Sequence, residues 1–299
     1  MNRKSYKIIV ATLFLMLFMP YFANSQEIPS YLRVASRPES IEEVSEKVKA
    51  TLKTNGFEII GEYNPEDKEG LKVIVYTRED IKKITYGVKD RGALAAALKI
   101  GLIREESQTI VSMLNPTYLF YGYLRENIID YTSLLEITED ARKAMQSIGT
   151  DFEPFGGTVK LEKLIKYKYM IGMPGFDKPV ELKEFLSFSE GVETIRKNLQ
   201  EKTGNCISVY ELIDDEKQIA VFGVGLYDEE IGEAKFLPII GEAHIAAMPF
   251  ELILQGNKAT MLHGRFRIAL HWPDLTMGTF MKISKTPGAV EELMLGLME

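Results

Sequence analysis

Apolar residues recur at helical spacing in two widely separated stretches of the chain. The first covers residues 40–54 and is followed by Asn55-Gly56, and the second begins 147 residues later and closes at Thr203-Gly204. The apolar positions that share this spacing are Ile41, Val48 and Leu52 in the first stretch and Phe188, Ile195 and Leu199 in the second. Both stretches are therefore predicted to be amphipathic helices that end where glycine interrupts the pattern.

The segments that follow these helices occur in the same order. Each helix is followed by two strand-like segments, an apolar run and a further strand. The strand-like segments are residues 57–60 with 71–77 and residues 206–213 with 218–226, and the apolar runs are residues 95–103 and 246–254. We therefore predict an α+β fold with two similar domains, each an antiparallel sheet with helices packed on one face, arranged as a tandem repeat.

This pattern divides the chain into four parts. Residues 1–25 are predicted to be a signal peptide, 26–126 the first domain, 127–187 a mostly helical connector, and 188–299 the second domain. A helix is expected in the connector over residues 138–148. The connector also carries a local basic cluster of Lys160, Lys163, Lys166 and Lys168. These lysines could contact an acidic partner or a lipid head group, or they form a solvated helix face.

The first 25 residues resemble a secretory signal peptide. Three basic residues precede the apolar run Ile8–Phe22, and Ala23-Asn24-Ser25 then supplies small residues for a signal peptidase. We expect cleavage before Gln26 and export to the periplasm or the exterior. The run is 15 residues long, whereas a membrane-spanning helix needs about 20. We thus expect no stable membrane span after cleavage, with a retained anchor as the alternative.

Composition narrows the possible functions. Hydrophobic residues make up 45% and charged residues 26% of the chain, which is typical of a globular protein. The net charge is -7, and loss of the first 25 residues would leave 33 basic and 43 acidic residues, a net charge of -10. This balance argues against nucleic-acid binding, which needs a basic footprint. The single cysteine, Cys206, excludes an internal disulfide and a Cys-based zinc site, and we expect it to be buried in a strand.

Candidate chemistry gathers in the second domain. Residues 262–270 alternate between apolar and polar positions, which predicts a half-buried strand. We expect it to pair with residues 248–255 through the three-residue loop 256–258, which would place Glu251 opposite His263 and diagonal to Arg265. The residues expected on the polar face are Glu251, His263, Arg265, Arg267 and His271.

Three interpretations of this face remain open. The first is a binding site for a small or partner-borne anion, because two neighbouring arginines can bind a carboxylate or phosphate. The simpler alternative is that these residues form a structural ion pair across the two strands. The second is a hydrolase-type site in which Glu251 orients His263. The third is a copper site formed by His244 with either His263 or His271, helped by Met248, Met261, Met277 or Met281. His263 and His271 would lie about 27 Å apart on a straight strand and could not share an ion. The sequence contains no GxSxG elbow, HExxH helix, Walker loop or GxGxxG turn, and no catalytic residue, metal ligand or cofactor is assigned.

The second domain resembles an uncharacterised bacterial family. The residues that carry the likeness are 248–254, 265–270 and Trp272-Pro273-Asp274-Leu275. The chain is similar there to the domain of unknown function 302, also described as TT1751-like, over residues 187–299 and more faintly over residues 40–125. The resemblance implies a compact α+β domain with helices against an antiparallel sheet. It implies no catalytic residues, and two copies in one chain depart from the single-domain form of that family.

Overall fold

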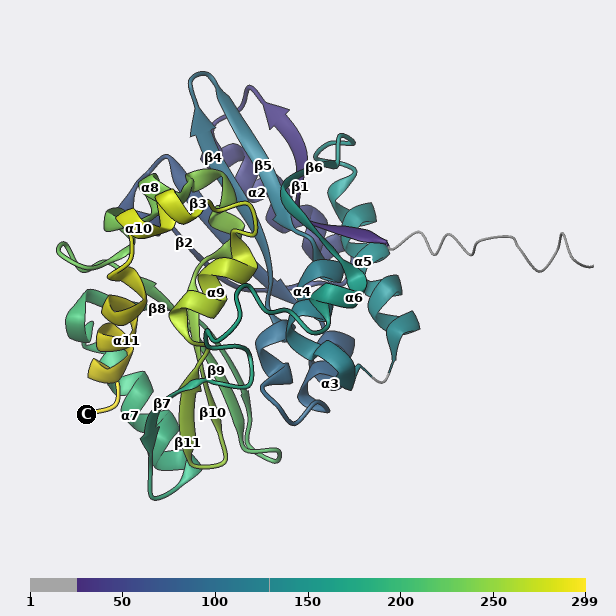
Figure 1. Cartoon of the computed structure of the whole chain (residues 1–299). Helices are drawn as coiled ribbons and strands as arrows, with labels where there is room; N and C mark the ends of the chain where they lie inside the picture. Colours follow the sequence, from purple (N-terminus) through teal and green to yellow (C-terminus); the bar gives the residue numbers. More distant parts are fainter. Residues whose placement is uncertain (1–25, 129) are drawn as a thin grey trace, which may run out of the picture.

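The computed structural model describes residues 26–128 and 130–299, so the predicted signal peptide lies outside the described residues. Two antiparallel sheets with associated helices make up the fold, which confirms the α+β class. In Figure 1 the sheet formed mainly by the first part of the chain, in purple and blue, lies above the sheet formed by the second part, in green and yellow.

The first sheet has six strands in the order β2-β3-β4-β5-β1-β6. Their bounds are β1 Glu27–Arg37, β2 Glu58–Tyr63, β3 Leu71–Thr77, β4 Leu98–Glu105, β5 Gln108–Leu114 and β6 Glu153–Lys160. The N-terminal strand β1 is internal, with β5 on one side and β6 on the other. Its Pro29 has no N–H to donate to a ladder, and the register shifts between Pro29 and Tyr31, where a bulge accommodates it.

The second sheet has five strands in the order β7-β11-β10-β9-β8. Their bounds are β7 Val180–Glu184, β8 Cys206–Asp214, β9 Ile219–Leu226, β10 Phe250–Gln255 and β11 Lys258–Met261. Every residue of β9 is buried, and Cys206 at the start of β8 is buried as a free thiol, which confirms that expectation. Burial raises the pKa of the Cys206 thiol to about 12, so it stays protonated and unreactive.

Ten α-helices lie in the described part of the chain. Their bounds are α2 Ile41–Thr54, α3 Glu79–Tyr86, α4 Pro116–Leu124, α5 Tyr131–Met145, α6 Leu161–Leu164, α7 Phe188–Gln200, α8 Leu237–Ile240, α9 Gly264–His271, α10 Met277–Lys282 and α11 Thr286–Gly296. Short 3₁₀ helices η2 (Gly92–Ala96), η5 (Glu233–Lys235) and η6 (Glu242–Ala247) precede strands or helices in loops. The two amphipathic helices predicted from the apolar spacing are present as α2 and α7.

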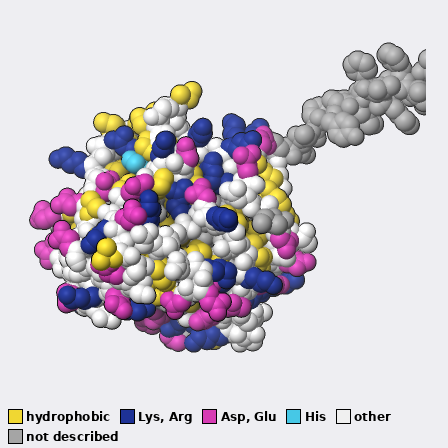
Figure 2. Space-filling model, turned by 90° about the horizontal axis from the view of Figure 1, so that it is seen from below, with side chains coloured by type: hydrophobic (Ala, Val, Ile, Leu, Met, Phe, Trp, Pro, Cys, Tyr) yellow, Lys and Arg dark blue, Asp and Glu magenta, His cyan; other side chains and the backbone are white. Residues whose placement is uncertain are grey.

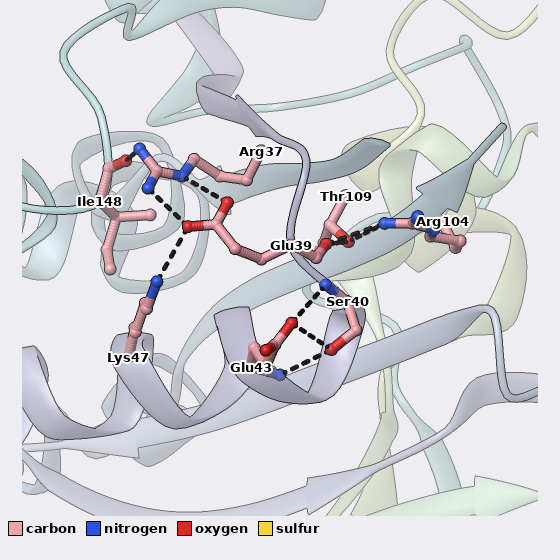
Figure 3. Close-up of polar contacts among 8 residues, drawn as sticks. All are labelled: Arg37, Glu39, Ser40, Glu43, Lys47, Arg104, Thr109 and Ile148. Atoms are coloured by element: carbon pink, nitrogen blue, oxygen red, sulfur yellow. Dashed lines mark hydrogen bonds and ion pairs between the residues drawn. The ribbon is translucent and has the colours of Figure 1, made fainter. Parts of the chain in front are cut away.

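Local side-chain bonds fix where α2 begins. The Ser40 hydroxyl accepts from the Glu43 N–H, and the Glu43 carboxylate accepts from the Ser40 N–H, a capping box that satisfies two free donors of the first turn. Figure 3 shows this box beside Glu39, whose carboxylate binds Arg37 and Lys47. At α7, the Ser187 hydroxyl caps the helix in the same position. Both starts therefore follow from a serine before the apolar periodicity.

The segment of residues 127–187 contributes to both sheets. After α5 it forms β6, which pairs with β1, and then β7, which pairs with β11. The expected helix over residues 138–148 is observed as α5 but begins at Tyr131, because Asp130 accepts from the Ser133 N–H and caps an earlier turn. Residues 127–187 thus tie the two sheets together through main-chain pairing.

The two sheets meet through their edge strands β2 and β8. A Cβ atom on Gly61 of β2 would lie 2.1 Å from the backbone oxygen of Val209 in β8. The 3₁₀ helix of each half also packs on the other half, η6 against β4 and η2 against β10. The contact between sheets is therefore close and involves backbone on both sides.

We predict that Gly61→Ala destabilises the protein by about 1–3 kcal/mol, because the added methyl group must push β2 away from β8. Urea denaturation would measure this loss. Gly70→Ala is the matched control, since its Cβ would come no closer than 3.8 Å to the Cβ of Arg104. Equal stability of the two variants would contradict the close contact between the edge strands.

Candidate functional site

The segment expected to form a strand over residues 262–270 is instead the helix α9, so that prediction was wrong. His263 begins the helix, because its Nδ1 accepts the backbone N–H of Arg265 at 3.2 Å. The alternation of apolar and polar residues gave a wrong prediction because α9 is buried on several sides. A short buried helix shows no clear helical periodicity of apolar residues. His263 and His271 are therefore separated by about 12 Å of helical rise rather than by an extended strand.

The expected hairpin register was also wrong. β10 and β11 are joined by the two-residue loop Gly256-Asn257, with Gln255 opposite Lys258 and Leu252 opposite Met261. Gly256 has a φ of 58°, which a glycine adopts without strain. Because β11 ends at Met261, residues 262–270, which were expected to pair with residues 248–255, lie beyond the sheet. Glu251 consequently pairs in the sheet with Gly223 of β9, and not with His263.

A buried charge cluster joins the two sheets. Lys99 of β4 donates to Oε1 of Glu251 in β10, and the Arg267 Nε of α9 donates to Oε2 at 3.1 Å. The Arg267 Nη2 also donates to the carbonyls of Ala247 and Pro249. Burial lowers the pKa of Lys99, and the nearby Glu251 carboxylate opposes that effect. With the three side chains at most 3% exposed, this cluster is inaccessible to a ligand and is structural.

Two buried histidines, His244 and His271, pack against Trp272. The His271 Nε2 lies 2.8 Å from the Tyr123 hydroxyl, and burial holds the pKa of His271 well below its usual value, with Arg267 adding to the effect. The His244 ring packs edge-on against Tyr31 at 4.9 Å, and burial lowers its pKa too. Both imidazoles are therefore neutral at pH 7 and act as core groups.

A surface pocket of about 540 Å³ lies over the outer side of α9. The chain segment after α6 and the helix α10 form its other walls. Its lining is mainly apolar and includes Tyr167, Met170, Ile268, Trp272, Phe280 and Met281. Among the residues that the structure describes, Lys168 and Arg265 are the charged residues of the lining, and no acidic residue lines it. The pocket therefore combines an apolar wall with positive charge.

Arg265 is placed to meet a ligand in this pocket. It is half-buried on the outer side of α9, and its Nη1 lies 3.8 Å from the Met173 sulfur. Within residues 26–128 and 130–299, neither Arg265 nor Lys168 forms an ion pair. A guanidinium with free donors beside an apolar wall can receive a carboxylate or similar group.

The five predicted site residues divide into two groups. Glu251, Arg267 and His271 lie together in the interior, whereas His263 and Arg265 lie at the start of α9. Of the five, Arg265 alone lines the pocket, and His263 does not. The Glu251 carboxylate is bonded to Lys99 and Arg267, so it does not orient His263.

The groups considered for copper are spread over different environments. His244, Met248 and Met261 are buried, whereas Met277 and Met281 are exposed along the pocket. Within the part of the chain that the structure describes, no three His, Cys, Asp or Glu residues are grouped to hold a metal ion. The same described residues include no helix long and apolar enough to cross a bilayer.

Two features of the site were absent from the sequence analysis. Lys99 was missed as the partner of Glu251, although Glu251 is the single charge of β10 and Lys99 is the single charge in the buried part of β4, before the exposed Arg104 and Glu105. Such charges must find a partner when the strand is buried. The pocket was missed because α9, the loop after α6 and α10 are separated in sequence, and no local pattern indicates that they meet.

Comparison with solved structures gives a weak likeness. No protein-family model matches the chain, and no curated protein matches it. The chain is similar to the crystal structure of an uncharacterized conserved protein, DUF302, from Bacillus stearothermophilus. The two share 14% sequence identity, the match covers 42% of this chain and 98% of that chain, and the TM-score is 0.32. A likeness at this level carries no argument about function.

Proposed function

We propose that the protein is a non-catalytic binding module whose pocket takes an apolar ligand bearing a carboxylate or another small anionic group. The observation that carries this proposal is Arg265 in the lining of an otherwise apolar pocket without acidic lining residues. The volume of about 540 Å³ is within the range of small-molecule sites. The proposal keeps the anion hypothesis with Arg265 but not with Arg267, which is already paired.

Each part of the pocket has a separate role in this proposal. Tyr167, Phe280 and Met281 would cover the apolar part of the ligand, since burying such surface favours binding by about 25 cal/mol per Å². Arg265 would receive the anionic group, with Lys168 as a second cation at the rim. The equivalent outer side of α4 is covered by α5 and leaves a gap of only about 10 Å³. Among the described residues of the first half, this position therefore holds only a narrow gap.

The probe for this site is anilinonaphthalene sulfonate, an apolar ring system with one anionic group. We expect it to bind in the pocket and to be displaced by dodecanoate more effectively than by dodecanol. Arg265→Gln should weaken dodecanoate binding about tenfold and leave dodecanol unaffected, because the substitution removes a charged hydrogen-bond donor. Arg33→Gln is the control, since Arg33 is an exposed arginine on β1 outside the pocket.

Equal affinity for dodecanoate and dodecanol in the wild-type protein would exclude a role for the anionic group. Dodecanoate binding that is unaffected by Arg265→Gln would exclude this residue as its receptor. Displacement can be followed by probe fluorescence. The single tryptophan, Trp272, lines the pocket and provides a second signal.

We also infer that the protein is exported and that its two halves descend from one unit related to DUF302. The order of elements supports the second inference: helix, two strands, short helices, two strands and helix occur from α2 to α4 and again from α7 to α9. The sequence of residues 1–25 supports the first. N-terminal sequencing of the protein recovered outside the cytoplasm should begin at Gln26, and an intact N-terminus there would contradict cleavage.

A further inference from the structure

The loop of residues 168–175 carries exposed apolar side chains beside the pocket. Ile171 is 100% exposed, and Met170 and Met173 are also exposed and flank it in sequence. Exposed apolar residues on soluble proteins usually occur singly. Three of them on one loop at the mouth of an apolar pocket indicate a surface that contacts a binding partner.

Both ends of this loop are fixed to the body of the protein. At one end, the Tyr167 hydroxyl donates to the Ala269 carbonyl at 2.7 Å. At the other, Phe176 is buried with its ring 5.9 Å from that of Phe266, and Arg91 donates to its carbonyl at 2.6 Å. The tip is thus held away from the core by two anchors.

A second group of apolar side chains stands across the pocket on α10. Met277 and Met281 are exposed, and both line the pocket together with Met170 and Met173. We call the loop 168–175 together with α10 the docking surface. Flexible apolar side chains therefore rise on two sides of the pocket mouth.

Positive charge accompanies these apolar groups. Lys168 and Arg265 line the pocket, and the exposed Lys282 follows Met281 on α10. These cations stand out in a chain whose net charge is -7. Figure 2 shows apolar side chains projecting at the upper edge of one face, with Lys and Arg side chains close by. An apolar tip with cations behind it complements an anionic lipid surface, with its apolar interior and charged head groups.

We propose that the docking surface binds the anionic face of a lipid bilayer. Ile171 and the neighbouring methionines enter the boundary between head groups and acyl chains, and Lys168 and Lys282 contact the head groups. The pocket mouth then faces the lipid. In this last respect the inference rests on the proposed function, since an amphiphile could pass between bilayer and pocket. Docking itself does not need an occupied pocket.

Tryptophan fluorescence tests whether the loop enters lipid. The natural Trp272 is 1% exposed, so an additional response from Ile171→Trp reports the loop tip. Vesicles of phosphatidylcholine with phosphatidylglycerol should shift its emission to the blue, and vesicles of phosphatidylcholine alone should not. Leu186→Trp is the matched control, because Leu186 is 93% exposed and lies outside the docking surface. Its emission should not shift.

Cosedimentation with the same vesicles tests the energetic contribution of each group. Every variant is expressed as the full chain. Any vesicle binding due to residues 1–25 is then the same in all variants. Ile171→Glu should abolish the binding due to the loop, and Lys168→Gln and Lys282→Gln should each weaken binding about fivefold. Leu186→Glu and Lys53→Gln are controls at exposed positions elsewhere and should bind as the wild type does.

Several outcomes would overturn the docking proposal. Unchanged emission of Ile171→Trp with anionic vesicles would reject it. A blue shift that appears with protein concentration in the absence of lipid would show a contact between protein molecules instead. If the wild-type protein binds anionic vesicles but not anilinonaphthalene sulfonate, the proposed pocket function is rejected and the docking proposal stands. If it binds anilinonaphthalene sulfonate but not the vesicles, the docking proposal is rejected and the pocket function stands.

Discussion

Glu251→Ala should destabilise the protein by about 3–5 kcal/mol, because it leaves Lys99 and Arg267 buried without a counter-charge. The Lys99 and Arg267 side chains are each 1% exposed, so water cannot replace the lost carboxylate. Urea denaturation at pH 7 would measure the change. The loss of stability should be large because the charge cluster links β4 of the first sheet to β10 of the second, so that its disruption affects both sheets.

Two further variants make this test specific. Glu211→Ala removes the acid of an exposed pair with Arg196 and should cost less than about 1 kcal/mol. The triple variant Lys99→Met, Glu251→Leu and Arg267→Met should recover most of the loss, because apolar side chains can replace a buried ion cluster. A Glu251→Ala effect as small as that of Glu211→Ala would show that the cluster is hydrated.

The free energy of unfolding should decrease by about 3 kcal/mol as the pH rises from 5 to 8, owing to Glu233. Burial raises the pKa of Glu233 to about 7, whereas the same carboxyl titrates near 4.3 in an unfolded chain. Between these values the folded state binds more protons than the unfolded state, so the stabilisation present at low pH is lost as pH rises through 7. Urea midpoints at a series of pH values would measure this trend.

Glu233→Gln should remove the contribution of Glu233, which is about half of the total pH dependence. Some slope should remain, because burial also raises the pKa of Glu66 to about 7, with Glu242 as the next cause. The Glu66 N–H donates to Oε2 of Glu233 at 3.0 Å, and the Tyr63 hydroxyl donates to Oε1 at 3.2 Å, so the acid links the two halves. A profile unchanged by Glu233→Gln would assign the titration to other groups.

The parts of the fold that the sequence predicted are those with strong local signals. Both long amphipathic helices have a serine cap and a wide apolar face, and α2 and α7 form where these signals occur. The helix α9 has neither a serine cap nor a wide apolar face. It has eight residues, a histidine as its cap, and burial on most sides, so its pattern also suited a strand.

The candidate site was predicted only in part because it depends on tertiary contacts. Arg265 was identified from its residue type, and it does line the pocket. Its separation from Arg267 depends on a helix, which places these neighbours on different sides, whereas a strand would place them on the same side. The loop tip at Ile171 had no local signal, since a fully exposed isoleucine reads as core in sequence.

The internal position of β1 determines when the first sheet can form. Tyr31 pairs with Leu114, and Ile28 pairs with Val159, so both partners of this strand come much later in the chain. A chain that emerges from its N-terminus leaves β1 unpaired until β5 has followed, and leaves its other edge open until β6 has followed. Such long-range pairing makes folding slow and leaves an apolar edge open to aggregation meanwhile. The order of synthesis therefore makes β1 the strand of this sheet that waits longest for its partners.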